Sequence, residues 1–247
     1  MMRLKSKYAK KIMEGDSMKK LKYKQLVSAS ITRIRDKEND EFHFVRNETK
    51  ITFGKGGNLL GSVIMTNPGS FSFKGDSEWN KFIIGIGPDT FNKSDGHPDP
   101  TMINIIKSIE DAYEQINTKV PDGYIKIYNL SSARCPKASE AEACHQSIKN
   151  VMCSTSINMA LLEDPIVCDE GKFIEMCKES PFVIMGFIKN TFMNKANLIK
   201  SWENNANIKN IVQAKNDKGW PIHPICWIKL KGKMYYNDVV NQIKQII

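Results

Sequence analysis

Three polar residues stand at or just beyond predicted strand ends, and their side chains could carry out chemistry together. Asn67 follows the apolar run 60–65, Asn129 lies near the end of the run 124–130, and His223 lies in the segment PIHP. An amide offers donors and an acceptor, so it can read the edge of a nucleobase. A histidine can stabilise negative charge that develops on a leaving group. Taken singly, each residue is typical of a turn or a structural contact, but their joint placement favours a site.

The backbone around Asn67 suits a binding position. Pro68 fixes its own φ and holds Asn67 outside the helical region, and Gly69 allows the chain to come close to a ligand. In open α/β sheets, ligands bind just beyond the carboxyl ends of the strands. Asn67, Pro68 and Gly69 are therefore candidate site residues. The alternative is an ordinary exit from a strand into a loop.

Alternating strands and helices must position these side chains. The strands are predicted at 27–35, 41–53, 60–65, 124–130, 182–187 and 208–214, and the helices from Pro100, at 139–150, 169–179 and 191–204, and from Asn237 to the end. Such alternation predicts a parallel sheet with right-handed crossovers. The first two strands predict an antiparallel hairpin. We therefore expect an α/β fold, a three-layer sandwich with a central four-stranded, mainly parallel sheet, plus the N-terminal hairpin.

The segment 67–98 predicts a long loop that carries several aromatic residues, among them Phe71 and Phe73. Loops of this length are usually functional or disordered. The rings could pack in the core or could stack on a ligand, and both interpretations remain open. Asp99 is predicted to cap the helix that starts at Pro100.

The charge balance is strongly basic. The chain has 247 residues and a net charge of +9, and basic side chains crowd the N-terminal segment 1–25. A net positive charge of this size attracts polyanions, for example nucleic acid or nucleotides. A general bias of the composition towards lysine would give the same net charge. Residues 26–247 are expected to form a single α/β domain.

The sequence predicts a cytoplasmic protein without a membrane partner. It holds no apolar run of 18 residues, and its N-terminus lacks the apolar centre of a signal peptide. Its six cysteines include no CxxC pair, which favours reduced thiols over disulfides or a zinc site. We expect neither a metal nor a cofactor.

The segments MTNPGS, HPDPT, YNLSSAR and GWPIHPICW occur in this order. They resemble a widespread bacterial and phage family of uncharacterised domains, whose pattern is L-N-P-S, D-P-T, N-L-F-x-x-R and G-x-P-x-H-P-L-Y. The resemblance covers roughly residues 27–235. The chain departs from it at Gly69, where Ser is frequent, at Gly186-Phe187, where Trp-Gly is usual, and at Cys226-Trp227, where Leu-Tyr is common.

The same order of segments is similar, more distantly, to the uracil-DNA glycosylase superfamily. That resemblance implies that Asn67 positions the attacking water, that Asn129 reads the base and that His223 stabilises the leaving base. No Asp follows Thr66, so a carboxylate is missing at that position, and Asp99 is the candidate substitute.

In such an enzyme the base flips out of its stack into the pocket. Phe71 or Phe73 would then stack on it, and Lys215 and Lys218 would hold phosphates. The expected function is therefore a base-excising hydrolase, a DNA N-glycosylase. The alternatives are a nucleic-acid-binding module of the same fold without chemistry, of phage or mobile-element type, and an interaction protein that binds no nucleic acid.

Overall fold

The computed structural model describes residues 24–69, 71–73, 75–117 and 120–247. The predicted basic segment 1–25 lies outside the described residues except for its last two. The strands are β1 (Leu26–Asp36), β2 (Glu41–Phe53), β3 (Leu59–Met65), β4 (Thr90–Gly96), β5 (Gly123–Asn129), β6 (Val183–Met185) and β7 (Ile211–Val212). The helices within these residues are α2 (Ser77–Ile83), α3 (Pro100–Gln115), α4 (Ala141–Thr155), α5 (Glu170–Glu179), α6 (Met193–Asn205) and α7 (Met234–Ile246).

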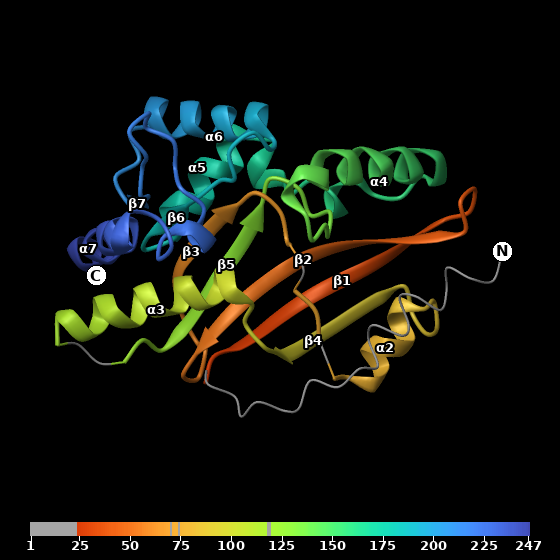
Figure 1. Cartoon of the computed structure of the whole chain (residues 1–247), viewed down its shortest axis with the longest axis horizontal. Helices are drawn as coiled ribbons and strands as arrows, with labels where there is room; N and C mark the ends of the chain where they lie inside the picture. The colour runs from red at the N-terminus through yellow and green to blue at the C-terminus, as the bar shows by residue number, and fades with distance from the viewer. Residues whose placement is uncertain (1–23, 70, 74, 118–119) are drawn as a thin grey trace.

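One mixed sheet of seven strands runs through the molecule in the order β4-β1-β2-β5-β3-β6-β7 (Figure 1). β5, β3, β6 and β7 are mutually parallel, whereas β1 pairs antiparallel with β2 and with β4. The α/β class and the hairpin are confirmed. The sheet is nevertheless wider than the four strands expected, because β2 also pairs antiparallel with β5 and so joins the hairpin to the parallel strands.

Helices cover both faces of the sheet (Figure 1). On one face, α3 and α7 pack together over a core that also takes in the aromatic rings of α2. On the other face, α5 and α6 cover the parallel strands, and α4 covers the hairpin strands. The two faces follow from the alternation of strand side chains, since Val63 belongs to the first core and Ile64 to the second.

The prediction of one long loop over 67–98 was wrong, because this segment contains α2 and β4. Helix α2 begins after Asp76, whose side chain accepts hydrogen bonds from the backbone N–H groups of Glu78 and Trp79. Strand β4 has the sequence TFNKSDG, in which only Phe91 and Gly96 are buried. Pairing with β1, rather than its own apolar pattern, makes this segment a strand.

Several helix boundaries also differ from the predictions, and the largest differences concern two helices. Helix α4 continues to Thr155, into a segment that the sequence did not predict to be helical, and α7 begins at Met234 instead of Asn237. The predicted start of α3 at Pro100 is confirmed. Within the described part of the chain, no helix combines the length and apolarity needed to cross a membrane.

Candidate functional site

A cavity of about 260 Å³ lies beyond the carboxyl end of β3. Residues predicted for the site line it from three separate parts of the chain, namely Asn67, Pro68, Gly69, Asp99 and His223. Residues that the sequence did not single out complete the wall, among them Arg46, Cys135, Ile188 and Ile225. The structure thus brings half of the predicted site residues together in one cavity.

The turn that carries Asn67 is fixed from two sides. Thr66 is fully buried, and its Oγ1 accepts a hydrogen bond of 2.7 Å from the backbone N–H of Ile188, beyond β6. The Asn67 amide donates from Nδ2 to the carbonyl oxygen of Cys135, beyond β5, at 2.9 Å. Gly69 has a φ of 63°, a left-handed conformation that costs glycine little. The Asn67 side chain is therefore held in one orientation at the cavity.

His223 is 7% exposed and lies in the wall of the cavity. Its Nδ1 accepts a hydrogen bond from the backbone N–H of Ile225 at 3.3 Å, so the proton of the neutral ring resides on Nε2. Burial lowers the pKa of His223 to about 4. At neutral pH the ring is therefore uncharged, with an N–H group that can donate to a ligand.

The loop that carries His223 is held by contacts that lie far apart in the sequence. Gly186, just after β6, allows a close approach, because a Cβ there would lie 2.8 Å from the carbonyl oxygen of Ile222. Asn104 on α3 donates to the carbonyl oxygen of Pro224 at 2.8 Å. The buried Trp227 donates from Nε1 to the carbonyl oxygen of Ile222 at 2.8 Å. These contacts position His223, and sequence analysis did not identify their roles.

Asp99 caps α3, as predicted from the sequence. Its Oδ1 accepts hydrogen bonds from the backbone N–H groups of Thr101 and Met102, both at 2.9 Å. The carboxylate is half-buried in the cavity wall. Because both capping bonds use Oδ1, the second oxygen, Oδ2, is the atom that can accept a hydrogen bond from a water or a ligand.

Arg46 is a cavity residue that sequence analysis missed. It lies on β2, it is 1% exposed, and its guanidinium stands 4.9 Å from the centroid of the Phe71 ring. Burial lowers the pKa of Arg46 to about 10, Asp99 opposes this shift and Arg134 adds to it. The side chain remains a cation at neutral pH. The sequence around Arg46 did not indicate a place in the cavity wall, because the segment predicts only one strand of a hairpin.

Asn129 lies beside the cavity but is not among the residues that line it. It pairs with Met65 in the parallel ladder of β5 and β3, so the two side chains share one face of the sheet. Met65 itself lines the cavity. Asn129 is 4% exposed, and its Oδ1 has no hydrogen-bond partner among the described residues.

The remaining predicted residues lie outside the cavity wall. Phe71 and Phe73 are buried in the core that α3 and α7 cover, with ring centroids 5.3 Å apart. The structure therefore gives these rings a packing position rather than one on the cavity surface. Lys215 and Lys218 are exposed, in the segment between β7 and His223.

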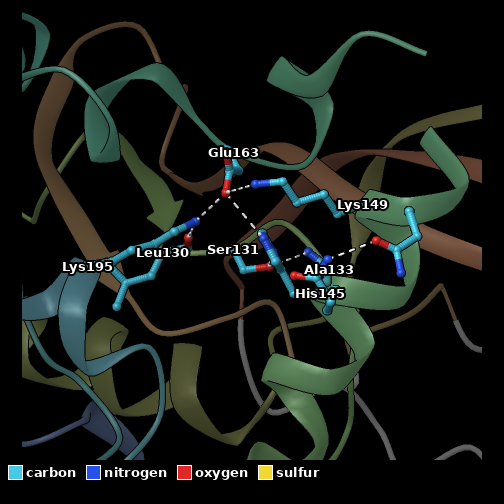
Figure 2. A network of polar contacts seen from close by, with 9 residues as sticks. Leu130, Ser131, Ala133, His145, Lys149, Glu163 and Lys195 are labelled. Atoms are coloured by element: carbon cyan, nitrogen blue, oxygen red, sulfur yellow. Dashed lines mark hydrogen bonds and ion pairs between the residues drawn. The ribbon is translucent and has the colours of Figure 1, made fainter. Parts of the chain in front are cut away.

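A second polar cluster lies beyond the end of β5 (Figure 2). Ser131 Oγ is 2.8 Å from His145 Nδ1, and His145 Nε2 is 3.2 Å from Glu163, which also pairs with Lys195 at 2.8 Å. The order of groups is that of a nucleophile, a base and a carboxylate. Ser131, however, is 0% exposed, and its Oγ also accepts from the backbone N–H of Ala133. We therefore interpret the cluster as a structural network that ties α4 and α6 to the sheet.

The cavity thus presents a neutral histidine donor, a guanidinium, a carboxylate and an amide. Within the described residues, no group of three or more His, Cys, Asp or Glu side chains is placed to hold a metal ion. No family model, curated protein or solved structure matches the chain. Function must therefore be inferred from the chemistry of the cavity.

Proposed function

We propose that the protein is a hydrolase that excises a nucleobase held in this cavity. One observation carries the proposal. Asn67, Asp99 and His223 come from three distant segments, and all three line one cavity beyond the end of a parallel strand. This is the place where open α/β sheets bind ligands. A cavity of about 260 Å³ suits a small, flat group better than a large ligand.

The groups in the cavity can be assigned roles in such a reaction. His223 donates from Nε2 to a carbonyl oxygen of the base, on which negative charge develops as the N-glycosidic bond breaks. Asn67 and Asp99 hold the water, and Asp99 Oδ2 accepts its proton as the water oxygen bonds to the sugar carbon. The base departs with the electron pair of the broken bond. Because the ring of His223 is neutral, it assists as a hydrogen-bond donor and not as a cation.

The surroundings of the cavity agree with a nucleic-acid substrate. The four parallel strands agree with the sheet that the distant resemblance to the uracil-DNA glycosylase superfamily implies. The same resemblance makes Asn129 the candidate base reader; its Oδ1 has no partner among the described residues, but the residue does not line the cavity. The exposed Lys215 and Lys218 can contact phosphates near the His223 loop.

The test uses single- and double-stranded oligonucleotides that carry uracil, mismatched thymine, hypoxanthine or a modified cytosine. Alkaline cleavage scores the abasic sites. We expect wild type to act on at least one of these substrates and His223→Ala to be roughly 100-fold slower, as for the loss of one donor to a developing charge. His43→Ala, near the tip of the β1–β2 hairpin, is the matched control and should retain wild-type activity.

An absence of cleavage on every substrate would contradict the proposal. So would equal activity in wild type and His223→Ala. A second candidate, a nucleic-acid-binding module without chemistry, is favoured by the net charge of +9. It predicts binding that weakens with salt and that Asn67→Ala and His223→Ala leave unchanged.

A further inference from the structure

The guanidinium of Arg46 is a buried cation whose hydrogen-bonding capacity is largely unused. It is 1% exposed, and its Nε and Nη1 have no hydrogen-bond partner among the described residues. No ion pair within 4 Å links it to a carboxylate in that part of the chain. Burying a charge without a partner costs free energy. Such a group is therefore expected where it serves a ligand.

The contacts that Arg46 does make leave this capacity unused. The Phe71 ring supports the guanidinium from a distance of 4.9 Å. A cation–π contact of this kind adds stability but satisfies none of the N–H groups. Nε and Nη1 are also closed to solvent, and Nη2 is the guanidinium nitrogen that is not among these closed atoms. Because Arg46 forms part of the cavity wall, Nη2 is the nitrogen to which a ligand in the cavity can bind.

The charges around the cavity favour an anion. Arg134 lies close enough to lower the pKa of Arg46, and its own Nε donates to the carbonyl oxygen of Phe71. Pro100 and Thr101, in the first turn of α3, also line the cavity, and a helix N-terminus carries partial positive charge. Against these stands the carboxylate of Asp99, which is already bonded to two backbone N–H groups.

We infer that Arg46 binds an anionic oxygen of the ligand in this cavity. The oxygen can belong to the departing base or to a phosphate, and a guanidinium suits both because it offers a planar fork of donors. This inference adds a ligand-binding residue to the proposed function. It rests on that proposal only where it takes the ligand to be part of a nucleic acid. With a base, Arg46 supplies the positive charge that the neutral His223 lacks.

The experiment measures the binding of two anions to the full chain by calorimetry and by thermal unfolding. The probes are inorganic phosphate and 5-nitrouracil, a base analogue that its nitro group makes anionic at neutral pH, with uracil as the neutral counterpart. We expect at least one anion to bind wild type at least about tenfold more tightly than Arg46→Met, a difference of about 1.4 kcal/mol. Arg35→Met removes an exposed arginine and should bind like wild type.

The two anions distinguish the sources of the oxygen. Binding of phosphate alone assigns the position to a phosphate group, and binding of 5-nitrouracil in preference to uracil assigns it to the base. Arg46→Lys keeps the charge but lacks the planar fork of donors, so it should bind the anion less tightly than wild type and more tightly than Arg46→Met. This intermediate affinity separates a loss of charge from a loss of folding in Arg46→Met.

The inference is overturned if neither anion binds wild type, if Arg46→Met binds as well as wild type, or if Arg46→Lys loses binding as completely as Arg46→Met. These outcomes are independent of the cleavage assay. Cleavage without anion binding would support the proposed function and contradict the role inferred for Arg46. Anion binding without cleavage would support the role of Arg46 and contradict the proposed function.

Discussion

At the scale of single residues, the neutral state of His223 has consequences for pH dependence. Its pKa is about 4 in the folded chain, below the ordinary value of 6.5. Between these two pH values His223 binds a proton in the unfolded chain but not in the folded chain. The free energy of unfolding therefore falls as the pH drops from 6.5 towards 4. His145 has a pKa of about 4 as well, because of burial and of Lys195, so it acts in the same direction.

The pH prediction concerns His223→Gln, which removes this titration. Wild type should lose up to about 3 kcal/mol of stability through this one group on acidification, and the variant should lose correspondingly less. Denaturant unfolding at neutral pH and near pH 4.5 measures both losses. Lys195→Met should weaken the contribution of His145 and leave that of His223 unchanged. An identical loss in wild type and His223→Gln would show that the ring is not kept neutral by burial.

Only part of the site could be predicted at this scale. Asn67, Asp99 and His223 could be found because each stands beside a proline that marks the end of a strand or the start of a helix. Arg46 could not, because its burial depends on Phe71 and on the pairing of β2 with β5. Phe71 shows the opposite error, in which a residue predicted for the site lies elsewhere. It was assigned to a loop and a ligand contact, but its ring packs in the core.

At the scale of elements, the site depends on how closely the His223 loop approaches the end of β6. Gly186 makes this approach possible, since a Cβ would stand 2.8 Å from both the carbonyl oxygen of Ile222 and the Pro224 ring. Backbone atoms cannot move aside as a flexible side chain can. A methyl group at residue 186 must therefore displace the segment that carries His223.

We predict that Gly186→Ala lowers the free energy of unfolding by about 1–3 kcal/mol, as overpacking does elsewhere. It should also impair the activity more than its loss of stability explains. Gly57→Ala is the matched control, because a Cβ there meets no atom within 4 Å and it should change stability by less than about 0.5 kcal/mol. Denaturant unfolding and the cleavage assay, run on both variants, provide the comparison. Wild-type behaviour of Gly186→Ala would mean that the loop adapts without moving His223.

The elements that could be predicted from the sequence are those with a local signal. β3 and β5 are short apolar runs between turn residues, and α3 begins with an aspartate cap and a proline. β4 has no such signal, because its residues alternate poorly and it forms only as the antiparallel neighbour of β1. The width of the sheet was missed for a related reason, since the pairing of β2 with β5 joins segments that lie far apart in the sequence, as in the pair Phe53 and Gly123.

At the scale of the whole molecule, the net charge of +9 predicts that binding to nucleic acid weakens as salt rises. Lys215→Ala combined with Lys218→Ala should lower the slope of log affinity against log salt concentration by about two, if both lysines contact phosphates. The variant Lys37→Ala/Lys178→Ala makes the same change in charge at two other exposed lysines. If both double variants reduced the slope equally, overall charge rather than the His223 loop would account for the binding.

The cavity is also a product of long-range assembly. Its wall includes Arg46 from the antiparallel half of the sheet, Asn67 from the parallel half, and His223 from near the end of the chain. Non-local pairings form late, because the entropy of closing large loops opposes them until other contacts are in place. During refolding, helices and hairpins are therefore expected to appear before ligand binding does. Competence to bind a ligand would then report completion of the native topology, which makes binding a sensitive probe of the last folding step.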